Sequence, residues 1–226
     1  MTIGLSSPSL DTLVETRVET GKAIDFHYQS MEISEASGDK QGIVNSLGGL
    51  SNAYYSLGNH QKAIDFHAQH NELAKAIGDK QGIANSLGSL GDVYDSLGDY
   101  QKAIDFHSQS MEIKQAISDK AGVARSLFNL GHALGKIDEH FNALQNYIKA
   151  KEIYEELKLD HIVEQCQNNI EVCTQTIAAQ RRTPPTLDDG YKSKPNYKKR
   201  QDRKQLRILW FCVGIAIVFL IAWLKK

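Results

Sequence analysis

Apolar side chains recur every three or four residues along most of this chain, the spacing that places them on one face of an α-helix. Between residues 83 and 97 the steps are four, three, four and three, through Ile83, Leu87, Leu90, Tyr94 and Leu97. The Gly-Asp pair at 98–99 interrupts this pattern, and a second helix is predicted from about residue 100 to residue 117. No segment alternates polar and apolar residues for long enough to predict a strand. The fold is therefore predicted to be all-α.

This pattern of two helices and two turns repeats every 40 residues. Residues 38–67 and residues 78–107 agree at 22 of 30 positions without a gap. A weaker copy starts at residue 118, and half a copy precedes the others. Each helix pair alone would leave an apolar face in water, so the pairs are predicted to stack into a solenoid. We define the first unit as the half repeat 20–37 and the second, third and fourth units as residues 38–77, 78–117 and 118–157.

Small residues hold fixed places in these units. The third unit has Leu90-Gly91 and Tyr94 on its first helix, and Ala103 and Ser110 on its second. Small side chains there let two helices approach to the near end of about 8–10 Å. The pattern resembles the tetratricopeptide repeat, in the 40-residue form of kinesin light chains and many cyanobacterial proteins. The resemblance covers residues 20–157 and implies a right-handed superhelical solenoid of helix–turn–helix repeats.

Two segments flank the predicted repeats. Residues 158–180 carry apolar side chains at helical spacing with a polar opposite face, which predicts a capping helix over the open end of the stack. Residues 1–19 are consistent either with a degenerate helix or with a frayed lead.

The composition changes at residue 181. Residues 1–180 hold 14 Lys+Arg and 24 Asp+Glu, whereas residues 181–226 hold 12 Lys+Arg and 3 Asp. Residues 181–207 include two adjacent prolines and little to bury, which predicts a flexible basic linker. Residues 208–224 contain no charge and as a helix span about 25 Å, close to the ~30 Å core of a bilayer. A buried core helix is the alternative, but no polar face accompanies the run, so we predict one C-terminal transmembrane helix.

The residues around this segment predict how it sits in a membrane. Indole rings and long basic side chains prefer the interface, and the candidates are Arg207, Trp210, Trp223, Lys225 and Lys226. A basic run precedes the segment and is predicted to contact anionic headgroups: Lys192, Lys194, Lys198, Lys199, Arg200, Arg203 and Lys204. Nucleic acid is the rival partner for such a run, but the adjoining apolar segment favours lipid. Positive charge on the N-terminal side, without a secretory signal over residues 1–10, predicts a tail-anchored protein with cytoplasmic repeats.

Neither catalysis nor a cofactor is predicted. His27, His67 and His107 recur 40 residues apart, but successive repeat helices stand roughly 10 Å apart. Metal ligands must lie within about 2 Å of one centre, so these histidines are interpreted as packing residues. No Ser/Cys–His grouping and no pair of carboxylates in an apolar site stands out, and three Cys cannot build a disulfide scaffold. No metal, small-molecule substrate or nucleic acid is expected.

Binding remains as the predicted activity. In tetratricopeptide stacks the first helices line a concave groove. When the family's groove positions are counted from the glycine position of each unit, the resemblance implies nine groove residues: Asn45, Asn52, Tyr55, Asn85, Asp92, Asp95, Arg125, Phe128 and His132. Asn amides can pair with a peptide backbone of any sequence, although such residues also simply solvate helices. The family's clamp for a C-terminal carboxylate needs Lys and Arg on adjacent first helices, and only Arg125 is available.

Three functional hypotheses follow. The leading one is a membrane-anchored adaptor whose repeats recruit a cytosolic protein or peptide. The second is a self-associating scaffold or assembly factor of a membrane complex. The third, suggested by cyanobacterial proteins that join such repeats to a caspase-like peptidase, is a regulatory partner of a separately encoded peptidase of that kind.

Overall fold

The computed structural model describes the backbone of residues 10–182 and the side chains of residues 17–180. The predicted transmembrane helix 208–224, with its interface residues Arg207, Trp210, Trp223, Lys225 and Lys226, lies outside the described residues. So does the predicted lipid-binding run: Lys192, Lys194, Lys198, Lys199, Arg200, Arg203 and Lys204. Among the helices within residues 10–182, none is long and apolar enough to cross a membrane.

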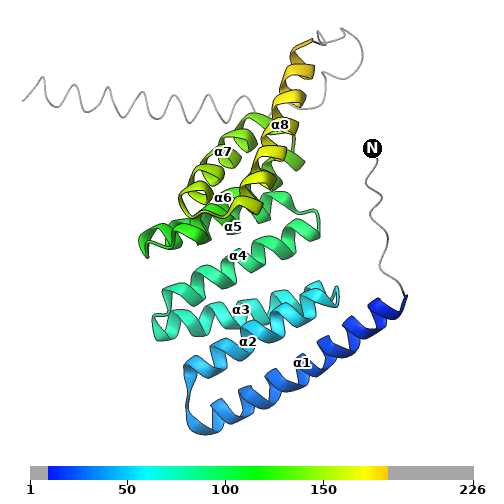
Figure 1. Ribbon diagram of the computed structural model, residues 1–226. Helices are drawn as coiled ribbons and strands as arrows, with labels where there is room; N and C mark the ends of the chain where they lie inside the picture. The colour runs from blue at the N-terminus through cyan, green and yellow to red at the C-terminus, as the bar shows by residue number, and fades with distance from the viewer. Residues whose placement is uncertain (1–9, 183–226) are drawn as a thin grey trace, which may run out of the picture. The chain divides into compact units, whose positions relative to one another are not determined.

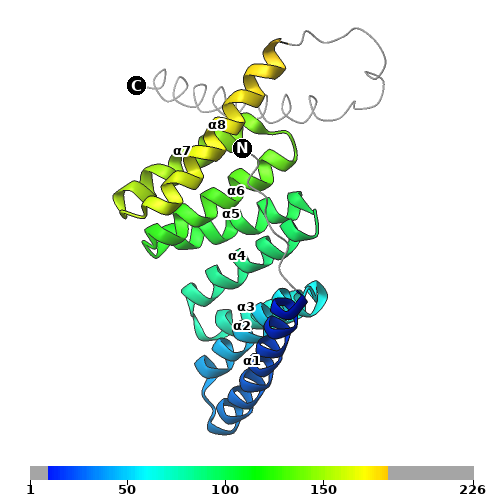
Figure 2. The same ribbon diagram turned by 45° about the vertical axis from the view of Figure 1, so that its right-hand side comes forward.

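Eight helices make up residues 10–182, and no strand occurs among them, so the all-α prediction is confirmed there. They stack in chain order, with α1 at one end and α8 at the other, as both ribbon views show (Figure 1, Figure 2). Each helix packs mainly against its neighbours in sequence. Their bounds are α1 Leu10–Ser37, α2 Lys40–Ser56, α3 His60–Ile77, α4 Lys80–Ser96, α5 Tyr100–Ala116, α6 Lys120–Lys136, α7 His140–Glu156 and α8 Asp160–Arg182.

The turns between helices follow from the repeated Gly-Asp or Ser-Asp pairs. Asp39, Asp79 and Asp119 cap the first helices, and each side chain accepts a hydrogen bond from the backbone N–H three residues later, at 2.8–3.0 Å. The glycine before Asp79 takes φ +75°, a left-handed conformation that glycine adopts without steric cost. Ser118 takes a similar φ of 60° before Asp119, at a cost of roughly 1–2 kcal/mol for a residue with a Cβ. The turn that leads into the fourth unit is thus energetically less favourable than the glycine turn that leads into the third.

Close packing inside each unit depends on the small residues and on aromatic pairs. Ala63, Ala103 and Ala143 are fully buried at equivalent places on the second helices. In the third unit the rings of Tyr94 and Phe106 stack with centroids 5.4 Å apart, and the second unit has the same pair in Tyr54 and Phe66, at 5.5 Å. These contacts fix how the two helices of a unit pack against each other. They therefore also fix which side chains lie on the other face of each first helix.

The two ends of the stack differ. Residues 10–19 continue α1 without a break, so the half repeat and part of its lead form one helix. α1 leaves a stripe of large apolar side chains in solvent, with Val18, Phe26 and Ile33 exposed by 52%, 65% and 69%. At the other end α8 packs on α7 and buries Cys166 and Cys173.

Candidate binding groove

Two adjoining cavities open between the helices of the second, third and fourth units. One, of about 310 Å³, is lined by Asn52, Asn85, Gly88, Ser89, Asp92, His107, Lys114, Arg125, Ser126 and Asn129. The other, of about 260 Å³, is lined by Asn45, Gly48, Gly49, Asn52, His67, His70, Asn85, Ser86 and Ser89. We call them the Lys114 cavity and the His70 cavity. Because Asn52, Asn85 and Ser89 line both, the two cavities form one groove.

Helical spacing on the first helices builds this groove. Asn85, Ser89 and Asp92 lie four and three residues apart on α4, which places them on one face of that helix. Glycine beside them leaves room, since a Cβ on Gly88 would stand 3.2 Å from the Oγ of Ser110 and 3.6 Å from the Nζ of Lys114. A larger residue at position 88 would fill the space in front of the lysine. The groove is therefore lined mainly by polar groups, and glycine keeps part of it open.

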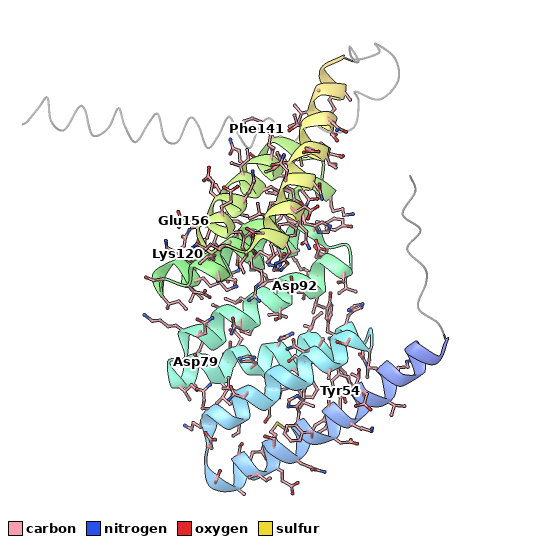
Figure 3. The ribbon with its side chains drawn as sticks, in the orientation of Figure 1. Tyr54, Asp79, Asp92, Lys120, Phe141 and Glu156 are labelled. Atoms are coloured by element: carbon pink, nitrogen blue, oxygen red, sulfur yellow. The ribbon has the colours of Figure 1, made fainter. Side chains whose placement is uncertain are left out.

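Asp92 supplies the negative charge of the Lys114 cavity. Figure 3 labels this residue on α4. Its Oδ1 accepts a hydrogen bond of 2.8 Å from the Nδ2 of Asn129 on α6, and it lies 3.7 Å from the Nε2 of His107. Burial raises the pKa of Asp92 to about 6, while the charge of Arg125 acts in the opposite direction. Burial lowers the pKa of His107 to about 4. At neutral pH the carboxyl group is therefore mostly ionised and the imidazole is neutral.

Lys114 is the most unusual residue of the groove. Its side chain is 1% exposed, and its Nζ donates a hydrogen bond of 3.3 Å to the Oγ of Ser126. Burial lowers the pKa of Lys114 to about 8, and the nearby charge of Arg125 lowers it further. Within residues 17–180, Lys114 forms no ion pair. The equivalent residues of the second and fourth units are Ala74 and Tyr154, so a buried charge at this place belongs to the third unit alone.

The lowered pKa of Lys114 predicts how stability depends on pH. Below pH 8 both folded and unfolded chains carry this proton, and folding bears the cost of burying the charge. Above pH 8 the folded lysine loses its proton, whereas the unfolded one keeps it up to its ordinary pKa of 10.5. The unfolded state then binds more protons, so this contribution to stability rises with pH.

We therefore expect the free energy of unfolding of the parent, relative to that of Lys114→Met, to increase by about 2 kcal/mol between pH 7 and pH 10. Urea unfolding of both proteins at the two pH values measures it. All other titratable groups are common to both proteins, so their contributions largely cancel in the difference. A constant difference across this range would show that Lys114 keeps its ordinary pKa.

Two buried histidines line the other cavity. His67 and His70 are nearly inaccessible, and within the described part of the chain the Nδ1 of His67 and both ring nitrogens of His70 lack a hydrogen-bond partner. Burial lowers the pKa of both, that of His67 to about 4, so both imidazoles are neutral at pH 7. No group of three or more His, Cys, Asp or Glu among the described residues is placed to hold a metal ion. These rings instead offer neutral donors and acceptors to a ligand in the groove.

The nine groove residues expected from the resemblance divide into two sets. The first set lines the cavities and comprises Asn45, Asn52, Asn85, Asp92 and Arg125. The second set does not, and two of its members contact each other, with the Nδ1 of His132 at 3.1 Å from the Oδ2 of Asp95. Tyr55 shares a hydrogen bond of 2.6 Å between its Oη and the Oγ of Ser96.

Phe128 packs against apolar side chains and lines neither of the two cavities. Its ring meets that of Tyr147 edge-on, with centroids 5.4 Å apart, and it packs against both apolar clusters formed by α6, α7 and α8. The aromatic ring gains more from that apolar contact than from the polar groove. The resemblance considered only the first helices, so it missed three residues of the second helices that line the groove: Lys114, His67 and His70. One signal in the sequence could have indicated Lys114: the first and second units have the small residues Ser34 and Ala74 at the equivalent position.

Comparison with known proteins finds a family match over part of the chain. The sequence model of the tetratricopeptide repeat matches residues 19–76 and 72–116. No curated protein matches the sequence significantly.

Several solved structures share the fold at low sequence identity. The apo form of RapI has 16% identity and a TM-score of 0.65, over 72% of this chain and 45% of that one. A Rap protein complexed with Competence and Sporulation Factor has 16% identity and a TM-score of 0.63, over 74% and 50%. Aspartyl phosphate phosphatase F from Bacillus subtilis has 15% identity and a TM-score of 0.64, over 74% and 45%. This chain thus matches half or less of the length of these proteins, and the likeness is one of fold.

Proposed function

We propose, because residues 19–116 carry tetratricopeptide repeats, that this protein is a membrane-anchored adaptor whose groove recruits a cytosolic protein or peptide. The observation that carries the proposal is the groove itself, two adjoining polar cavities between the helices of three successive units. A Rap protein of the same fold was solved with Competence and Sporulation Factor, which is in keeping with partner binding by such a stack.

The chemistry of the groove suits a polypeptide ligand. Asn52 and Asn85 line both cavities, and each amide offers both a donor and an acceptor. The Oδ1 of Asn85 already accepts a hydrogen bond of 3.2 Å from Gln81, which directs its Nδ2 to other partners. A peptide backbone presents alternating N–H and C=O groups, and amide side chains can bind these without regard to sequence. The side chains of the partner then meet the histidines in one cavity and the charged groups in the other.

The anchor is proposed from the sequence. The uncharged run at 208–224, with Trp near both ends and basic residues on either side, supports one transmembrane helix at the C-terminal side of the repeats. The excess of Lys and Arg before this run supports a cytoplasmic position for the groove. The same basic residues support contact with anionic headgroups beside it.

A self-associating scaffold is the second candidate, and the exposed stripe on α1 favours it. Phe66 and Phe106 are stacked on Tyr54 and Tyr94 of their own first helices. Phe26 holds the equivalent place on α1 and remains 65% exposed. A second copy that covered this stripe would extend the stack. Light scattering on the full chain in detergent separates the two functions, because an adaptor is expected to be monomeric.

The adaptor proposal predicts that groove amides hold the partner. We expect Asn52→Ala/Asn85→Ala to reduce partner recovery about tenfold in affinity capture from the native membrane, since each lost hydrogen bond contributes about 0.5–1.5 kcal/mol. The matched control is Gln69→Ala/Asn168→Ala, which removes two exposed amides that line neither cavity. Quantitative mass spectrometry of the captured proteins measures the effect. Equal recovery from both double variants would argue against binding in the groove.

A further inference from the structure

We infer that Lys114 and Arg125 form a subsite for one carboxylate group of the polypeptide bound in the groove. This inference rests on the proposed function and deepens it, because it names the chemistry that the Lys114 cavity selects. The subsite differs from a clamp built on adjacent first helices, since Lys114 belongs to the second helix α5 and Arg125 to the first helix α6. The two residues meet in one cavity because α5 packs directly on α6.

The cavity presents two cations that the protein itself leaves unpaired. Among residues 17–180, neither Lys114 nor Arg125 forms an ion pair. One donor of the Lys114 ammonium reaches Ser126, and an ammonium group has three. A charge removed from water in this way is costly unless a partner compensates it. The lowered pKa of Lys114 agrees with an uncompensated charge, and an anion beside it would raise that pKa again.

The nearest acidic residues are engaged elsewhere. Asp92 accepts a hydrogen bond from Asn129 on the same cavity wall. Asp119 caps α6 by accepting from the backbone N–H of Gly122, and it also accepts a hydrogen bond from Gln81. Both carboxylates partly offset the charge of Lys114 from a distance, and neither closes an ion pair with it. Space for another anion remains in the cavity of about 310 Å³.

The charge balance favours a carboxylate over a phosphate. At pH 7 Lys114 and Arg125 are cationic, Asp92 is anionic and His107 is neutral, which leaves a net charge of +1 on the cavity wall. A carboxylate neutralises that charge, whereas a phosphate monoester carries about −1.5 to −2 and would leave an excess of negative charge beside Asp92. The amides of Asn52, Asn85 and Asn129 supply neutral donors around the anion. The source of the carboxylate is an Asp or Glu side chain or the C-terminus of the partner.

The test uses the full-length ¹⁵N-labelled protein in an uncharged detergent, with short peptides as probes of the cavity. The capped peptide Ac-Ala-Glu-Ala-NH₂ is titrated beside its neutral counterpart Ac-Ala-Gln-Ala-NH₂, and NMR follows the side-chain amides of the groove. We expect the Glu peptide to bind at least about tenfold more tightly, as for hydrogen bonds to charged groups. We expect this preference to disappear in Lys114→Met and in Arg125→Gln, and to persist in Lys80→Gln, which removes an exposed cation outside both cavities.

Two further peptides identify the kind of anion. Tighter binding of Ac-Ala-Ala-Ala-OH than of the Glu peptide would assign the carboxylate to the partner's C-terminus. Tighter binding of Ac-Ala-pSer-Ala-NH₂ than of either carboxylate would overturn the inference. Equal binding of the Glu and Gln peptides would also overturn it while leaving the groove intact, because the Asn52→Ala/Asn85→Ala capture experiment tests the groove without reference to charge. Arg125 is exposed, so its variant keeps the test valid even if Lys114→Met fails to fold.

Discussion

Ala103→Leu is expected to lower the free energy of unfolding by about 1–3 kcal/mol. Ala103 is 0% exposed on α5, at the place where the small residues let the two helices of the third unit approach. Three added carbon atoms there must separate α5 from its neighbours or force a strained rotamer. For a chain of this size we expect the melting temperature to fall by roughly 2–8 °C, measured by circular dichroism on the full chain in detergent.

The matched control is Gln101→Leu, two positions earlier on the same helix. Gln101 is exposed, so the same new side chain reaches solvent, and its effect on stability is expected to stay within about 0.5 kcal/mol. Lys102 is a poorer control because its Nζ pairs with Asp99 at 2.9 Å and lies over the ring of Tyr94. Should Gln101→Leu destabilise the chain while Ala103→Leu melts with the parent, the register assigned to α5 would be wrong.

The register of the helices could be predicted because the sequence repeats itself. An alanine at the same place in three units signals a constraint that one unit alone would not reveal, and all three alanines are fully buried. The all-α fold and the helix pairs followed from the same periodicity. The start of α1 could not be predicted in this way. The first unit is a half repeat, so no first helix precedes α1 to mark where it begins, and its large apolar side chains stay exposed.

The groove was less predictable than the fold. Polar residues are mostly exposed in folded proteins, so the sequence predicts an exposed Lys114. Lys114 is buried instead, because neighbouring small residues leave a cavity for its long side chain. Phe128 shows the opposite departure, since the second and third units have Gly48 and Gly88 at its position and α8 offers its ring an apolar partner surface. Both outcomes depend on contacts between helices distant in sequence. The pattern of polar and apolar residues within a single helix does not reveal these contacts.

The second large effect concerns membrane attachment. A chain that ends at Arg182 is expected to lose membrane association completely, because the remaining residues lack an uncharged run of bilayer length. Its helices should stay folded, since α1 to α8 pack on one another within a single compact unit. Carbonate washing of membranes, followed by immunoblotting of pellet and supernatant, measures the change.

A point substitution tests the same proposal without removing the linker. Ile217→Lys places a charge near the middle of the run 208–224, where a lysine costs about 2.5–3.5 kcal/mol on insertion scales, so we expect much of the protein to become extractable by carbonate. The matched control replaces Lys192, Lys194, Lys198, Lys199, Arg200, Arg203 and Lys204 with Gln. This control should keep the protein in the pellet, because headgroup contacts add only about 1 kcal/mol for each basic residue near the surface and carbonate does not remove a spanning helix. If the chain ending at Arg182 remains in the carbonate-washed pellet, the repeats themselves must hold the membrane, and the anchor proposal fails.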